Sequence, residues 1–178
     1  MAATPFLKKA STNPAEALIQ EFPQEAAITR RVLERMPEEH LAWRPHPRSM
    51  SLGVIALHVA NSPGFFIKWI AADAVDLTEA SRPEARTRVE ILAAHQGSFD
   101  AVMQALRAAG EEGLSGAVRL RKNGATFMTM PKMAVVRTLV INHTIHHRGQ
   151  LLLYLRLLGV PVPAVYGASA DEAPFQQV

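Results

Sequence analysis

The segment INHTIHHRGQLLLYLRLLGVP, residues 141–161, places three of the chain's seven histidines within five positions and follows them with a run of leucines. Its apolar spacing and its closing glycine and proline predict the end of a helix that begins at Pro131. With about 100° per residue, His143 and His147 lie one turn apart at the centre of the apolar stripe of this helix. His146 lies on the flank of that stripe.

Two histidines at positions i and i+4 on one helix face are spaced so that a single metal ion can bind both imidazoles. Because an unsatisfied buried polar group costs about 1–3 kcal/mol, these two rings need partners. A divalent ion is one possible partner, and a backbone carbonyl or a carboxylate from a neighbouring helix is the other. The residues of this helix alone leave both interpretations open.

A metal site needs at least one further ligand from another helix. His58 is the best candidate, because it lies on the inward face of a helix that we expect to start after Ser51. His95 is the rival candidate, since it lies on the apolar stripe of the next predicted helix. His40 and His46 lie in or near the proline-rich segment AWRPHPRSM, where a solvated histidine is the usual outcome.

Helix-start signals occur four times along the chain, and they predict four main helices. These signals are capping side chains or first-turn prolines at Asn13–Pro14, Ser51, Thr87 and Pro131. The segment VRLRKNGATFMT carries an Asn-Gly turn between two alternating flanks, which predicts a β-hairpin before the last helix. The expected fold class is therefore all-α, a four-helix bundle with one small hairpin. We expect a single domain over residues 1–178, with residues 1–12 flexible and residues 160–178 forming an extended tail.

The composition favours a soluble protein with one core. The chain has 178 residues, of which 48% are hydrophobic and 20% charged, and its net charge of +3 is spread among acidic residues. This pattern does not indicate a nucleic-acid surface. The absence of cysteine excludes disulfides, thiolate ligands and a cysteine nucleophile. The N-terminus has no signal-peptide core, and the apolar stretches are interrupted before the ~20 residues that a membrane span needs. We therefore expect a cytoplasmic protein that does not bind a membrane.

The segment NHTIHHRGQLLLYLRLLGVPVPAVYG resembles the signature of the DinB-like family of metal-dependent proteins, which is related to the bacillithiol S-transferases. The similarity extends upstream through VLERMPEEHLAWRPHPRSMSLGVIALHVA and covers about residues 24–168. The resemblance implies a DinB-like four-helix bundle, usually dimeric, that holds a divalent ion such as zinc or nickel with three histidines. By the family pattern these ligands are His58, His143 and His147.

Three neutral imidazoles leave the charge of a divalent ion uncompensated and at least one coordination position open, which is typical of catalytic metals. The bacillithiol branch implies an enzyme that transfers a low-molecular-weight thiol to an electrophile. The alternatives are metal-dependent hydrolysis, with His46, Asn142 or Gln150 as polar helpers, and a non-catalytic stress-response protein whose ion holds the helices together. A carboxylate is also expected to hydrogen-bond the ligand rings.

The composition of the last helix also indicates that the protein forms an oligomer. Between Gln150 and Leu158 only Arg156 and the hydroxyl of Tyr154 interrupt the apolar residues, so more than one face of this helix is apolar. Such a helix is either central in the fold or buried against a partner. We therefore expect a homodimer that binds a small-molecule substrate.

Overall fold

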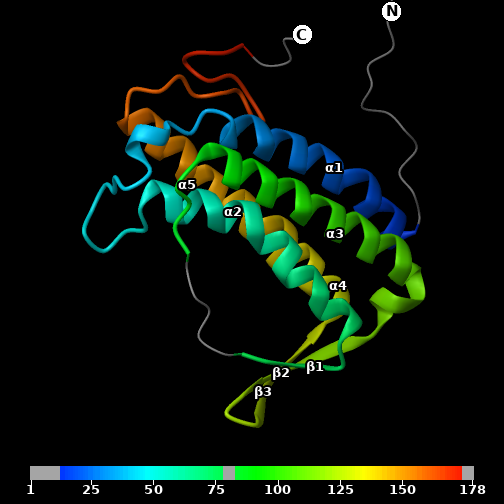
Figure 1. Ribbon diagram of the computed structural model, residues 1–178. Coiled ribbons are helices and arrows are strands. Elements are labelled where there is room, and N and C mark those ends of the chain that lie inside the picture. The colour runs from blue at the N-terminus through cyan, green and yellow to red at the C-terminus, as the bar shows by residue number, and fades with distance from the viewer. Residues whose placement is uncertain (1–12, 78–82, 174–178) are drawn as a thin grey trace, which may run out of the picture.

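A computed structural model describes residues 13–77 and 83–173 of the chain (Figure 1). Within these residues the protein is mostly helical, with four helices and a small three-stranded sheet. The helices are α1 (Pro14–Leu33), α2 (Leu52–Ile67), α3 (Arg88–Ser115) and a last helix made of α4 (Lys132–Ala134), the π-helical segment η3 (Val135–Asn142) and α5 (His143–Leu157). Two short 3-10 helices, η1 (Glu38–His40) and η2 (Lys68–Ala71), follow α1 and α2. The segment 1–12, which we expected to be flexible, lies outside the described residues.

Three of the four predicted helix starts are confirmed by the hydrogen bond of a capping side chain. The Asn13 side chain accepts from the backbone N–H of Ala15 at 2.9 Å, and Ser51 and Thr87 cap α2 and α3 in the same way. These caps satisfy N–H groups that have no partner within the helix. α3 is interrupted at Gly110, whose φ of 57° is not helical, and it continues as a second helical segment to Ser115.

The sheet contains one strand more than the sequence predicts. β2 (Ala117–Lys122) and β3 (Ala125–Pro131) pair in an antiparallel arrangement around a turn at Asn123 and Gly124. Both turn residues have positive φ, 52° and 79°, as a type I′ turn requires. The additional strand β1 (Ala74–Asp76) pairs in parallel with β2. Its three residues are too few to produce a periodic pattern that sequence reasoning could detect.

The four helices lie side by side (Figure 1), and their apolar faces form two clusters of buried residues. One cluster lies next to the sheet and includes Leu18, Val102 and Val136. The other includes Leu33 and Leu151, together with the first half of α2. Because α2 contributes its first half to one cluster and its end to the other, its middle turns are held at a fixed position.

The segment Leu52–Ala71, formed by α2 and η2, is long and apolar enough to cross a membrane by length and composition. This differs from the expectation that every apolar stretch is interrupted before that length. Half of its most apolar window is buried inside the protein, and α2 packs against α3, η3 and α5. This is the setting of a core helix, for which an apolar composition is normal.

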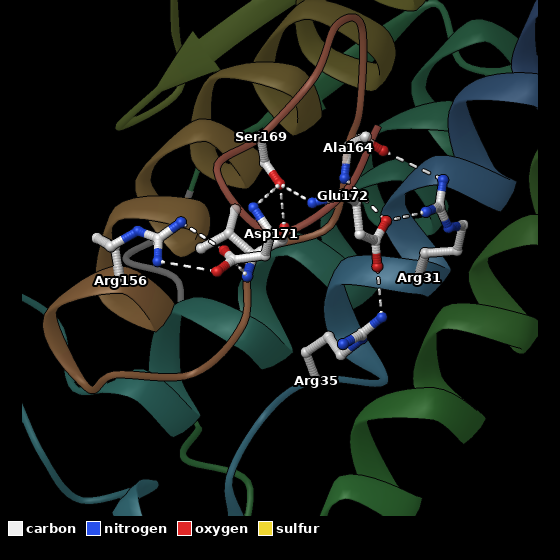
Figure 2. Close-up of polar contacts among 8 residues, drawn as sticks. Arg31, Arg35, Arg156, Ala164, Ser169, Asp171 and Glu172 are labelled. Carbon is white, nitrogen blue, oxygen red and sulfur yellow. Dashed lines mark hydrogen bonds and ion pairs between the residues drawn. The ribbon is translucent and has the colours of Figure 1, made fainter. Parts of the chain in front are cut away.

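The described part of the C-terminal tail, residues 160–173, has no helix or strand and lies over one end of the helices (Figure 1). Figure 2 shows the polar contacts that hold it there. Glu172 binds Arg31 of α1 and Arg35, which lies just after α1, each at 2.6 Å. Asp171 pairs with Arg156 of α5. The Ser169 hydroxyl accepts from the backbone N–H groups of both acidic residues. The tail is therefore fixed to two helices by two acidic side chains.

Candidate metal centre

Three histidines from two helices converge at one point. His58 comes from the middle of α2, and His143 and His147 come from the first turns of α5. The Nε2 atoms of His58 and His143 are 3.3 Å apart, and one nitrogen from each of the three rings lies within 4.8 Å of the other two. The ring centroids are 4.5–4.9 Å apart. The structure therefore brings together the three residues that the family pattern implies, and such a group can hold a metal ion.

The geometry of the three rings fits a single small cation. The ring planes meet at 76°, 85° and 80°, so the imidazoles surround a common point without stacking on one another. Zinc–nitrogen bonds of about 2.0–2.1 Å at the tetrahedral angle place two ligand nitrogens about 3.3 Å apart. The separation between the Nε2 atoms of His58 and His143 has this value.

Gln150 orients one of the three rings. Its Oε1 atom lies 2.7 Å from Nδ1 of His147, and because an amide oxygen only accepts, Nδ1 carries the proton. The lone pair of His147 is then on Nε2, the other ring nitrogen. We expected a carboxylate in this position, and the structure has a neutral amide. The Gln150 amide nitrogen also lies 3.3 Å from Nε2 of the exposed His146.

His143 is held in its neutral form. The pKa of His143 is lowered to about 4, first by burial and then by the nearby charges of His147, His58 and His146, in that order. Its Nδ1 atom is buried without a hydrogen-bond partner among the described residues. A neutral imidazole offers a lone pair to a metal ion, whereas a protonated one does not. The local environment of His143 therefore favours metal binding at neutral pH.

The three histidines line a cleft of about 960 Å³ between α2, α3 and α5. A ligand cleft of this size is at the upper end of the range for small-molecule sites. One wall is fixed where α2 meets α3: the backbone N–H of Gly64 donates to the Ser98 hydroxyl at 2.6 Å. A Cβ atom on Gly64 would lie 2.8 Å from that oxygen, so this close approach of the two helices requires glycine.

The family model that matches this chain is that of the DinB family, over residues 9–177. The chain belongs to the DinB family. Its curated relatives include two uncharacterized proteins of Bacillus subtilis (strain 168). YrdA is 28% identical over 158 residues, with 83% of this chain and 85% of YrdA covered. YjoA is 23% identical over 143 residues, with 80% of this chain and 89% of YjoA covered.

Solved DinB-like structures share the fold of this DinB-family protein. A DinB-like protein from Bacillus cereus ATCC 10987 aligns with a TM-score of 0.69 at 24% identity, covering 85% of this chain and 97% of that one. The structure of YjoA from Bacillus subtilis aligns with a TM-score of 0.64 at 18% identity, covering 83% of this chain and 96% of that one. The DinB-like fold inferred from the sequence is therefore confirmed.

The last helix of this DinB-family protein differs from the regular α-helix assumed in the sequence analysis. Residues 135–142 are π-helical, and the Thr144 hydroxyl donates to the Val140 carbonyl at 2.7 Å where α5 begins. The buried stripe of α5 runs through Thr144 and Arg148, and the two histidines lie beside it, half-buried and facing the cleft. Their placement at the centre of the apolar stripe was wrong, although their i, i+4 spacing holds. π-helical segments often occur at functional sites.

From the sequence, Arg148 could pair with an acid or a partner subunit, or be solvated, and the structure shows it paired with an acid. It is only 1% exposed and donates to the Glu25 carboxylate at 2.9 Å, the Thr29 hydroxyl at 3.0 Å and the hydroxyl of Tyr166. The Tyr166 hydroxyl also donates to Glu25 at 2.6 Å. Burial and this bond to Glu25 raise the pKa of Tyr166 to about 12. The network joins α5, α1 and the tail through the residue that follows His147 in the sequence.

The remaining candidate residues lie away from the three histidines. His95, the rival ligand, is buried on α3 and hydrogen-bonds the Ala26 backbone; burial, followed by the charge of Arg30, lowers its pKa. His46 and Asn142, two of the three predicted polar helpers, are exposed and do not line the cleft. Of the three helpers, only Gln150 contacts a histidine of the cluster.

Proposed function

We propose that this DinB-family protein binds a divalent transition ion, zinc or nickel, through His58, His143 and His147, and that it uses the site catalytically. The observation that carries the proposal is the convergence of three half-buried imidazoles at a large cleft. Imidazole is a preferred ligand of both ions. A closed set of four protein ligands is typical of a structural metal, whereas three ligands beside a cleft leave room for a substrate.

We further propose that the reaction is the transfer of a low-molecular-weight thiol to an electrophile. When bound, a divalent ion supplies positive charge that lowers the pKa of a thiol or a water molecule. The thiol sulfur forms a bond to the electrophilic carbon, the leaving group departs with the electron pair of the broken bond, and the thiol proton passes to solvent. The thiol comes from a second substrate, because the chain has no cysteine.

Hydrolysis is the second candidate, and the cleft supports it less well. Water is a far weaker acid than a thiol, so metal-dependent hydrolases usually add a general base that accepts its proton. No Asp or Glu lines the cleft among the described residues. Asn61, one turn after His58, is the nearest polar side chain along α2 that lines it, and an amide does not accept a proton at neutral pH.

The experiment that tests the reaction measures thiol conjugation with purified, zinc-loaded protein. A panel of thiols, including bacillithiol, glutathione and cysteine, is incubated with 1-chloro-2,4-dinitrobenzene, and product formation is followed by absorbance. We expect a zinc-dependent rate with at least one thiol, and we expect His147→Ala to abolish it. His46→Ala is the matched control, because His46 is exposed and lies outside the cleft. Zinc-independent rates, or equal loss in both variants, would contradict thiol transfer at this site.

We also propose that the protein forms a homodimer through α5. The side chains of Leu153 and Leu157, one turn apart, are 58% and 56% exposed, which is unusual for a leucine pair on one helix face. Burying both removes apolar surface from water and stabilises the association. Light scattering at micromolar concentration should give twice the mass of the chain, and Leu153→Asp should reduce it to that of one chain.

A further inference from the structure

The residues that line the cleft beside the three histidines indicate which kind of ligand it binds. Its described walls are mainly apolar, and α2 contributes two aromatic side chains to them, Phe65 and Phe66. Their ring centroids are 5.2 Å apart, and Phe65 is 51% exposed although it is large and apolar. An exposed phenylalanine that lines a cleft offers a flat surface on which an apolar or aromatic group can pack.

The opposite wall, on α3, is built from small side chains. Ala94, Gly97, Ser98 and Ala101 line the cleft along successive turns of α3. A Cβ atom placed on Gly97 would meet no other atom within 4 Å, so the cleft is open at this point. The cleft therefore has room for a ligand group beside Gly97, on the side of α3 that faces it.

Among the described residues that line the cleft, only one is charged at neutral pH, and its charge is positive. Lys68 is the only Lys, Arg, Asp or Glu among the described residues that line it, and within the described part of the chain it makes no ion pair. A divalent ion on the histidines, which lie at another point of the same cleft, would add further positive charge. The field inside such a cleft attracts an anion. The cleft combines an apolar wall with positive charge, and the ligand should have the complementary properties.

We propose that the cleft binds a small amphipathic anion, a molecule with a flat apolar body and a carboxylate, sulfonate or phosphate group that pairs with Lys68. This inference deepens the proposed function, on which it rests, by assigning the substrate class of the same site. Lys68 follows His58 by ten residues, or about 15 Å of helix axis. A substrate that reaches from the histidines to Lys68 therefore has the length of two or three fused or linked rings.

Two fluorescent probes with the same aromatic body test the proposal. 8-Anilinonaphthalene-1-sulfonate carries a sulfonate, and N-phenyl-1-naphthylamine is its uncharged counterpart. Each is titrated against the full chain, once with a chelator and once with saturating zinc. We expect Lys68→Met to weaken the sulfonate about two- to five-fold, the range of an exposed charge pair, and to leave the neutral probe unchanged. Lys122→Met, on the exposed end of β2, is the charge control and should change neither affinity.

Filling the cleft tests where the probes bind. Gly97→Leu places a side chain in the open space and should weaken both probes at least ten-fold, with Ala101→Leu as a second variant should the first unfold. Ala108→Leu, on an exposed part of α3 outside this cleft, should leave both affinities unchanged. Unchanged binding in folded Gly97→Leu and Ala101→Leu protein would overturn the cleft as the binding site. Equal effects of Lys68→Met on both probes, or no effect on either, would overturn the anion assignment.

Comparing the titrations with and without zinc distinguishes a failure of this inference from a failure of the proposed function. We expect zinc to raise the affinity for the sulfonate and not for the neutral probe, because only the sulfonate is attracted by the added charge. If zinc does not bind, the proposed function fails, while the difference between the probes in the chelator arm still supports or refutes the role of Lys68. If zinc binds and Lys68→Met has no selective effect, the proposed function stands and the substrate class is refuted.

Discussion

Replacing the buried Arg148 with Met should lower the free energy of unfolding by about 3–5 kcal/mol, because it leaves an uncompensated charge in the protein interior. The Arg148 side chain is 2% exposed, and the side chain of its partner Glu25 is 16% exposed. Arg148 also donates to the Thr29 hydroxyl and the Glu25 carbonyl, which lose these bonds. Methionine fills most of the aliphatic volume, so the loss reports the polar network and not a cavity.

The magnitude can be measured in two ways. Urea unfolding followed by circular dichroism, with a chelator present, gives the free energy without any contribution from bound metal. For a chain of 150–250 residues each kcal/mol moves the Tm by about 2–4 °C, so the expected decrease in Tm is about 6–20 °C.

Two further variants identify the cause of the loss. Arg30→Met removes an exposed arginine that pairs with Glu34 at 2.9 Å, and it should cost less than about 0.5 kcal/mol. Adding Glu25→Gln to Arg148→Met removes the unpaired charge and should restore part of the lost stability. A loss below about 1 kcal/mol for Arg148→Met, or no recovery in the double variant, would refute the reasoning.

Three other predictions concern the histidines and the dimer. The pKa of His143 is lowered to about 4 in the folded protein, so the unfolded chain binds this proton more tightly. The free energy of unfolding of the metal-free protein should therefore fall by about 2 kcal/mol as the pH falls from 6.5 to 4, a figure reduced to allow for solvent screening. His143→Asn should lack this component in urea unfolding at several pH values. Gln150→Ala should weaken zinc binding about 10- to 100-fold by calorimetry, because it frees the His147 ring. Leu157→Asp should give a single-chain mass in light scattering, and a persistent dimer would exclude this face.

Local signals in the sequence were sufficient for most of the helical framework. The caps at Asn13, Ser51 and Thr87 act through side-chain hydrogen bonds to backbone groups a few residues away, so their chemistry is visible in a short window. The same holds for the turn at Asn123 and Gly124, where positive φ favours these two residue types. The i, i+4 spacing of the α5 histidines is local in the same sense.

Features that depend on distant segments could not be predicted. Arg148 is buried only because Glu25, far away in the sequence, and Tyr166 of the tail both reach it. The choice of His58 over His95 came from the family resemblance and from a helical-phase argument, and the residues alone left it open. The π-helical segment changed the phase of the last helix, so the two histidines of α5 lie beside its buried stripe and not at its centre.

The most direct test of the metal centre is the zinc content and zinc affinity of the protein, measured by elemental analysis and calorimetry. The parent chain should bind about one zinc ion per chain. His58→Ala and His147→Ala should each weaken binding at least about 100-fold, since a zinc site of 10–16 kcal/mol divides into roughly 3 kcal/mol or more per ligand. His46→Ala, an exposed histidine outside the cleft, should bind as the parent does. Zinc retained at the parental affinity by both ligand variants, or no zinc in the parent, would contradict a three-histidine metal site.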